Sequence, residues 1–184
     1  MEEYSTQFVE PTVSEQLFQR ELEQYYNLET QWNSKGVFLI TKKYPYLEFI
    51  FAHPFIVPSP ILFCVRVDFT NYNIVPPSIK FIHYCTKQPL KRKEILLNFW
   101  QTTSEGQQDL LQGHPDMEPF FCVRGVREYH NNPAHTGDDW LLYREKGEGT
   151  LYYLLNILHQ HSTPTIIGYG IQMNINLQQI NPKV

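Results

Sequence analysis

The chain has 184 residues, of which 42% are hydrophobic, and its 15 lysines and arginines against 19 aspartates and glutamates leave a formal charge of −4. This length suits one domain with a sizeable core, and we expect residues 1–184 to form one. The acidic balance, without a long basic run, argues against nucleic acid as a partner. No apolar run reaches the roughly 18–20 residues that span a bilayer, so we expect no membrane partner.

The sequence contains three cysteines, Cys64, Cys85 and Cys122. An odd number of widely spaced cysteines argues against a disulfide scaffold and indicates a reducing compartment, so we expect a cytoplasmic protein. The acidic start, Met1-Glu2-Glu3, does not resemble a signal peptide. A lone cysteine is most often a small buried apolar residue, and we expect this of Cys64 and Cys85.

The predicted elements begin with a helix from Ser14 to about Trp32, where apolar residues recur with an approximately helical period. Four short runs rich in β-branched and aromatic residues follow and predict strands. These runs are Val37–Ile40, Tyr46–Phe51, Ile61–Phe69 and Ser78–His83. One helix before four closely spaced strands predicts an α+β fold, in which the helix packs on a four-stranded antiparallel meander.

The second half of the chain contains an insertion and a second helix. Residues 87–113 are polar and rich in glutamine around short apolar runs, and they predict an insertion with one amphipathic helix. Leucines at helical spacing predict a C-terminal helix from Thr150 to His161, with Thr150 as its cap. The tail after Pro164 is apolar and then rich in Asn and Gln, so we expect it to add a strand or to lie along the surface.

A tyrosine and a proline pair follow the third predicted strand. Pro76 lies four residues after Tyr72, Pro77 comes next, and Phe81 lies four residues beyond the second proline. Two adjacent prolines cannot donate the hydrogen bonds of a sheet, so this segment must lie between strands. The spacing resembles the signature of ubiquitin-conjugating (UBC) enzymes.

The segment that leads to Cys122 resembles the active-site region of the same family. His114-Pro115-Asp116 begins eight residues before Cys122, and UBC enzymes have a His-Pro-Asn tripeptide shortly before the cysteine that carries ubiquitin as a thioester. Trp140 and the predicted C-terminal helix follow in the family's order. The resemblance implies a UBC-like fold with an active-site loop, in which we expect His114 to order the loop. Asp116 departs from the pattern, because a carboxylate cannot donate the hydrogen bond of an asparagine amide unless it is protonated.

The residues after Cys122 resemble a second pattern. Cys122, Glu128, His130 and His135 match, letter by letter, the predicted metal-binding CEHH domain of bacterial ubiquitin-like modification operons. This resemblance implies partners of three kinds, namely a ubiquitin-like protein, a ThiF-type activating enzyme and a JAB-type deubiquitinase. It also suggests a role in defence against phage.

Two chemistries are open to these four side chains. A thiolate, a carboxylate and two imidazoles form a tetrahedral ligand set for Zn²⁺. If Arg127–His130 is extended, Glu128 and His130 point to the same face, and a turn at 131–133 returns His135 to them. Without metal, Cys122 would be a nucleophile, with His130 or His135 as general base and Glu128 orienting the imidazole.

Three functional hypotheses follow from these resemblances. In the first, which we favour, the protein is a UBC-like acyl transferase whose Cys122 accepts a ubiquitin-like protein as a thioester. In the second it is a catalytically silent zinc-binding module of the same pathway, because a coordinated thiolate is a poor acyl carrier. In the third it is an interaction scaffold with a relict site, and residues 87–113 dock a partner.

Overall fold

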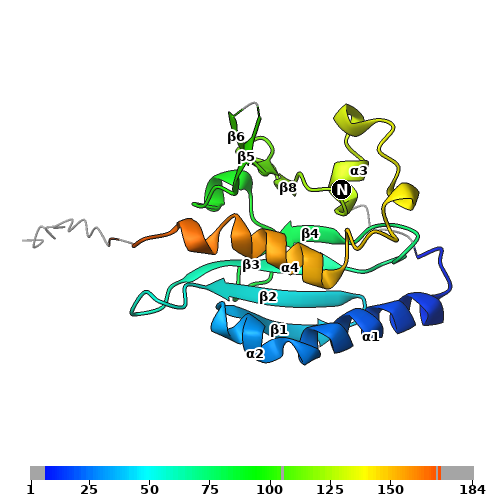
Figure 1. Ribbon diagram of the computed structural model, residues 1–184, viewed down its shortest axis with the longest axis horizontal. Coiled ribbons are helices and arrows are strands. Elements are labelled where there is room, and N and C mark those ends of the chain that lie inside the picture. Colours follow the sequence, from blue (N-terminus) through cyan, green and yellow to red (C-terminus); the bar gives the residue numbers. More distant parts are fainter. Residues whose placement is uncertain (1–6, 105, 169, 171–184) are drawn as a thin grey trace, which may run out of the picture.

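The computed structural model describes residues 7–104, 106–168 and 170, and one four-stranded antiparallel sheet lies at its centre (Figure 1). The strands pair in chain order, as the predicted meander requires. They are β1 (Val37–Lys43), β2 (Tyr46–Ala52), β3 (Ile61–Asp68) and β4 (Ser78–Phe81). The expected mixed architecture of helices with a four-stranded antiparallel sheet is therefore confirmed.

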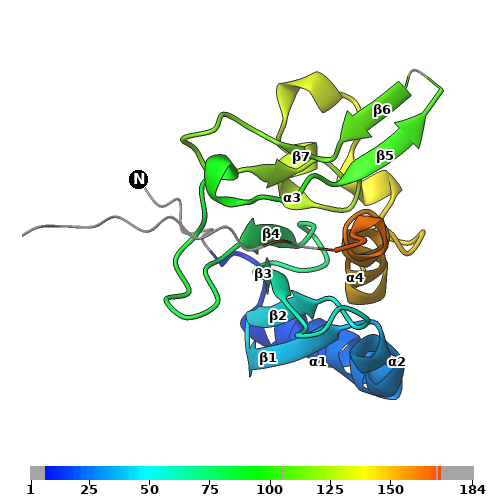
Figure 2. The same cartoon turned by 90° about the vertical axis from the view of Figure 1, so that its left-hand side faces the viewer.

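Helices cover one face of this sheet, as Figure 2 shows. They are α1 (Pro11–Asn27), α2 (Glu29–Ser34) and α4 (Leu151–Gln160). The sequence predicts a single helix from Ser14 to Trp32, but Leu28 ends α1 and begins α2. The break turns Trp32 into the core, where it is 2% exposed. The predicted C-terminal helix is confirmed by α4, and the Thr150 side chain caps it by accepting a hydrogen bond from the backbone N–H of Tyr153.

The core lies between the sheet and the helices. In β2, Leu47 and Phe49 lie opposite Val67 and Val65 of β3, and all four side chains are fully buried. Alternate residues of a strand point to the same face, so these four present one apolar surface. Phe18 of α1 and the buried leucines of α4 belong to the same cluster.

The described residues of 87–113, which leave out residue 105, contain no amphipathic helix, so that prediction is wrong. They form a 3₁₀ turn and short strands, namely η1 (Arg92–Glu94), β5 (Trp100–Thr103), β6 (Gly106–Asp109) and β7 (Leu111–Gln112). A hairpin joins β5 to β6, and β7 pairs with β8 (Phe120–Phe121), beyond the β4 edge of the sheet (Figure 2). Apolar residues of this segment enter the core singly rather than as one helical face. The main one is Phe99, which is fully buried against the rings of Phe63, Phe81 and Phe121.

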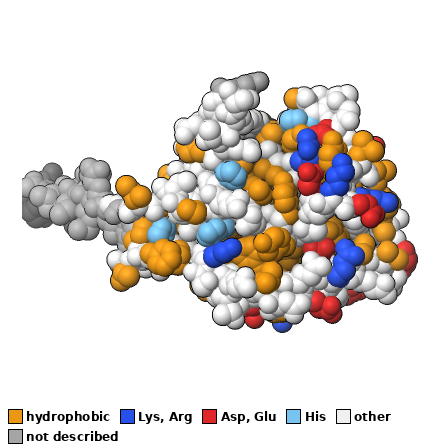
Figure 3. Space-filling view, in the orientation of Figure 1, with side chains coloured by type: hydrophobic (Ala, Val, Ile, Leu, Met, Phe, Trp, Pro, Cys, Tyr) orange, Lys and Arg blue, Asp and Glu red, His pale blue; other side chains and the backbone are white. Residues whose placement is uncertain are grey.

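Short turns build the segment between β8 and α4. They are α3 (Arg127–His130) and the 3₁₀ turns η2 (Pro133–His135) and η3 (Trp140–Leu142); a fourth turn, η4 (Thr163–Thr165), follows α4. Acidic and basic side chains gather on the surface where this segment meets the start of α4 (Figure 3). Within the described part of the chain, no helix is long and apolar enough to cross a membrane. Most of the tail, for which we predict a strand or a surface course, lies outside the described residues.

The three cysteines differ in their surroundings. Cys64 on β3 is buried, as expected, and burial raises the pKa of its thiol to about 11. The same expectation is wrong for Cys85, which is exposed. Cys85 lies in a turn after β4, where its backbone N–H donates a hydrogen bond to the His83 imidazole. Cys122 is buried at the end of β8.

Candidate functional site

Cys122 is held in place by its backbone and by the apolar residues on either side of it. Its N–H donates a hydrogen bond to the carbonyl oxygen of Leu110, at 2.7 Å. Phe121 before it and Val126 after it are fully buried, so the chain is anchored at both ends of this short stretch. Cys122 itself is 8% exposed, and burial raises the pKa of its thiol. The thiol therefore needs a neighbouring base to become reactive near neutral pH.

His135 is that neighbour. Its Nε2 atom lies 3.4 Å from the Sγ atom of Cys122, within hydrogen-bonding distance for sulfur. The turn η2 carries His135, and the Asn132 side chain begins this turn by accepting a hydrogen bond from the N–H of Ala134. The loop thus returns to its starting point after thirteen residues. A thiol and an imidazole in this arrangement can exchange a proton, which is the first requirement of a cysteine nucleophile.

Tyr129 covers one face of the His135 ring. The two rings are stacked, with centroids 3.8 Å apart and planes 19° from parallel. The Tyr129 hydroxyl donates a hydrogen bond to the Asp138 carboxylate at 2.6 Å, and Arg124 Nε donates to the same oxygen at 3.2 Å. The hydrogen bond from Tyr129 holds the pKa of Asp138 down at about 2, and burial together with this carboxylate raises the pKa of Tyr129 to about 12. No motif in the sequence marks Tyr129. The only signal is that an aromatic residue lies between two residues that match the CEHH pattern.

His130 shapes the loop and does not contact Cys122. Its Nδ1 atom lies 2.7 Å from the carbonyl oxygen of Asp138, and its Nε2 atom accepts a hydrogen bond from the N–H of Gly125. A carbonyl oxygen can only accept, so the proton of the neutral ring lies on Nδ1. Both nitrogens are therefore engaged by the backbone, and His130 ties the two ends of the loop together.

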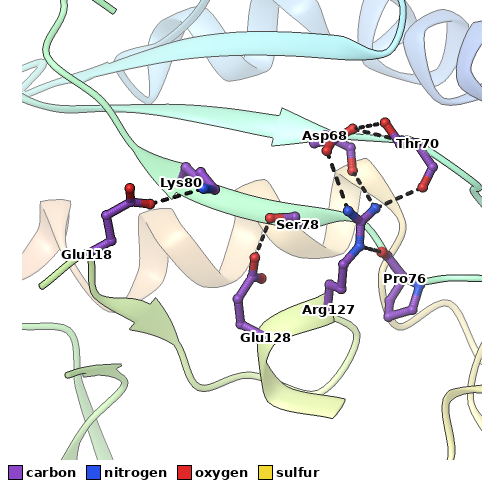
Figure 4. A network of polar contacts seen from close by, with 8 residues as sticks. All are labelled: Asp68, Thr70, Pro76, Ser78, Lys80, Glu118, Arg127 and Glu128. Carbon is purple, nitrogen blue, oxygen red and sulfur yellow. Dashed lines mark hydrogen bonds and ion pairs between the residues drawn. The ribbon is translucent and has the colours of Figure 1, made fainter. Parts of the chain in front are cut away.

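Glu128 is bonded to the sheet. The stretch Arg127–His130 is a helical turn, so the prediction of an extended backbone there is wrong. Glu128 bonds to Ser78, whereas His130 bonds to backbone groups of the loop. The Glu128 carboxyl accepts a hydrogen bond from the Ser78 hydroxyl on β4 (Figure 4). Its other oxygen is buried without a hydrogen-bond partner among the described residues. Burial raises the pKa of this carboxyl, which fits a role in docking α3 on the sheet.

The tyrosine and proline segment lies between β3 and β4, as its prolines require. Tyr72 is buried, and the Phe81 ring belongs to the core. Arg127 holds this segment to the site loop, because its Nε donates a hydrogen bond to the carbonyl oxygen of Pro76 at 3.1 Å (Figure 4). Its backbone N–H donates to the carbonyl oxygen of Pro77 at 2.9 Å. The tyrosine and proline segment is thus a part of the protein to which the Cys122 loop is hydrogen-bonded.

His114 and Trp140 have structural contacts. His114 is exposed, and its Nδ1 accepts a hydrogen bond from the N–H of Asp116 within its own turn. Its predicted role in the active-site loop stays a prediction. The carboxylate of Asp116 pairs with Lys93 at 2.6 Å. Trp140 is 4% exposed and donates from its ring N–H to the carbonyl oxygen of Asn73 at 3.0 Å. Among the described residues, His135 alone of the predicted catalytic partners reaches the sulfur of Cys122.

Comparison with known proteins places the chain in a family. The model of the Y4jH-like family matches residues 9–106 and 94–166, which together make up most of the chain. The chain belongs to the Y4jH-like family. It is similar to "Uncharacterized protein y4jH" of Sinorhizobium fredii (strain NBRC 101917 / NGR234), with 36% identity over 190 residues that cover 94% of this chain and 91% of the relative. The second segment matched by the Y4jH-like model contains the whole loop from Cys122 to His135.

The four predicted zinc ligands of this Y4jH-like chain do not converge on one point. Cys122 and His135 are in contact, whereas Glu128 is bound to Ser78 and His130 to the backbone. Within the described residues, no group of three or more His, Cys, Asp or Glu side chains lies close enough together to hold a metal ion. Zinc binding by all four ligands therefore requires α3 to release Glu128 from the sheet, and it stays a prediction.

Proposed function

We propose that this protein is a UBC-like acyl carrier in a bacterial ubiquitin-like conjugation pathway of the cytoplasm. In this proposal, Cys122 accepts the C-terminus of a ubiquitin-like protein from a ThiF-type activating enzyme, and a JAB-type deubiquitinase acts in the same pathway. The observation that carries the proposal is the 3.4 Å contact between Cys122 Sγ and His135 Nε2. It supplies a thiol with an adjacent base at the position that the resemblance gives to the acyl-carrying cysteine.

The order of elements supports the UBC-like part of the proposal. A helix, four antiparallel strands and a buried tyrosine and proline segment precede the cysteine, and a buried tryptophan and a helix follow it. The segment Tyr72–Pro77 lies against the cysteine loop through Arg127, so the two resembling motifs form one unit in space. This arrangement supports the UBC-like part of the proposal.

The chemistry assigned to the pair is a transthioesterification. His135 takes the proton of the Cys122 thiol, and the sulfur attacks the carbonyl carbon of the thioester that links the ubiquitin-like protein to the activating enzyme. A new carbon–sulfur bond forms at Cys122, and the bond to the enzyme's cysteine breaks. That cysteine leaves as a thiolate and is reprotonated from the imidazolium. Atoms and electrons balance without a further reactant.

The test is adduct formation with purified components. The protein is mixed with the ubiquitin-like protein, the activating enzyme and ATP, and intact mass is measured with and without a thiol reductant. We expect an adduct with the mass of one ubiquitin-like protein that the reductant removes. It should persist in Cys85→Ser and disappear in Cys122→Ala. No adduct on the native protein, or one that survives in Cys122→Ala, overturns the proposal.

A further inference from the structure

In the part of the chain that the structure describes, no orienting group is hydrogen-bonded to the proposed base of this site, His135. In cysteine–histidine sites, a third residue commonly bonds to the second imidazole nitrogen and so fixes the ring. Among the described residues, Cys122 is the one hydrogen-bond partner of the His135 ring. The half-exposed ring would be free to turn away from the sulfur if only that contact held it. Another interaction must therefore restrict the imidazole.

The stacked phenol of Tyr129 is the contact that can do this. At 3.8 Å between centroids and 19° between planes, the two rings lie face to face, so the imidazole cannot rotate out of its plane without losing the stack. Tyr129 comes from α3, and His135 from η2, so the stack also joins the two turns of the loop.

Tyr129 is itself fixed at its hydroxyl end. It donates to Asp138 at 2.6 Å, and Arg124 binds the same carboxylate at 3.2 Å. Arg124 also faces Glu148, at 3.7 Å, just before α4, and lies over the Tyr143 ring. Asp138 thus holds the hydroxyl end of the phenol, and Arg124 holds Asp138. The Tyr129 ring is therefore held at both its backbone and its tip.

We propose that Tyr129 is the positioning residue of this site, because its ring fixes the plane of the His135 imidazole while Asp138 fixes the phenol. This inference rests on the proposed role of Cys122 and His135 and adds how that pair is kept aligned. The third group of the site thus acts on the face of the imidazole rather than on its second nitrogen. Tyr129 does not touch the reacting atoms.

The test uses the rate at which iodoacetamide alkylates Cys122, measured by intact mass in a Cys85→Ser background. Cys64 is buried and contributes little. We expect Tyr129→Leu to slow alkylation about tenfold and to approach the rate of His135→Gln, because the imidazole no longer stays beside the sulfur. Tyr129→Phe keeps the ring but loses the tie to Asp138, so we expect it to restore most of the rate. Upfield-shifted ring protons of His135 in NMR spectra should persist in the Phe variant and vanish in the Leu variant.

The outcomes separate this inference from the proposed function. If His135→Gln alkylates at the native rate, the base role of His135 fails, and with it the proposed function. If His135→Gln is slow but Tyr129→Leu keeps the native rate and the native His135 chemical shifts, only the positioning role is overturned. If Tyr129→Leu does not fold, the Tyr129→Phe variant decides. Native chemical shifts of the His135 ring protons in this variant support the stacking role. Chemical shifts like those of the unfolded chain contradict it.

Discussion

Glu21→Ala should lower the free energy of unfolding by about 3 kcal/mol, because two buried hydrogen-bond donors lose their acceptor. Glu21 is 1% exposed on α1. One of its oxygens accepts from the backbone N–H of Leu151, the first residue of α4, at 2.9 Å, and the other accepts from the Tyr72 hydroxyl at 3.0 Å. The negative charge also lies at the N-terminal end of α4, where the helix dipole favours it. One side chain therefore joins α1, α4 and the segment that bears the prolines.

Urea unfolding followed by circular dichroism measures this effect. Glu23→Ala is the matched control, because Glu23 is exposed on the same helix, and we expect a change within about 0.5 kcal/mol. Glu21→Gln keeps the shape but places an amide N–H opposite one of the two donors, so its loss should be intermediate. Equal stability of the Glu21→Ala and Glu23→Ala variants would show that the buried carboxylate does not hold the helices together.

His135→Gln should slow formation of the Cys122 thioester about a hundredfold, since a positioned general base commonly contributes at least that much. Burial raises the pKa of the Cys122 thiol, so without an adjacent base the thiolate fraction near pH 7 is small. The same change should slow alkylation of Cys122. Initial rates of adduct formation at saturating activating enzyme measure the effect.

His114→Gln is the control for the His135→Gln variant. His114 precedes the cysteine at a position that the UBC-like resemblance makes prominent, yet it is exposed and bonds to its own turn. We expect its replacement to leave the rate of thioester formation within about twofold, because it removes no contact with Cys122. A large loss in His114→Gln with none in His135→Gln would reverse the roles that the geometry gives to these two residues.

Much of the fold was predictable because the strands alternate. Side chains such as Val65 and Val67 repeat every second residue, and the period of two belongs to strands alone. Residues 87–113 were not predictable in the same way. Their apolar residues, Phe99 among them, enter the core one at a time, largely from backbone outside helices and strands. Such residues follow neither the helical nor the strand period.

The site was predictable in part. The turn before His135 contains Asn132 and Pro133, which limit the chain enough to indicate its return to Cys122. The partner of the Glu128 side chain depends on whether Arg127–His130 forms a strand or a helical turn. A segment of four residues is too short to show the period of either. The stacking of Tyr129 on His135 could not be predicted from a motif, because the fold brings the two rings together and their spacing in the sequence does not.

The role of Cys122 is decided by the zinc content of the protein as isolated, measured together with the alkylation of Cys122. We expect zinc far below one equivalent and a Cys122 that reacts with iodoacetamide without prior chelation, because only Cys122 and His135 of the four predicted ligands are in contact among the described residues. One equivalent of zinc, with Cys122 protected until a chelator is added, would contradict it. That result would make Cys122 a metal ligand and the protein a zinc-binding module.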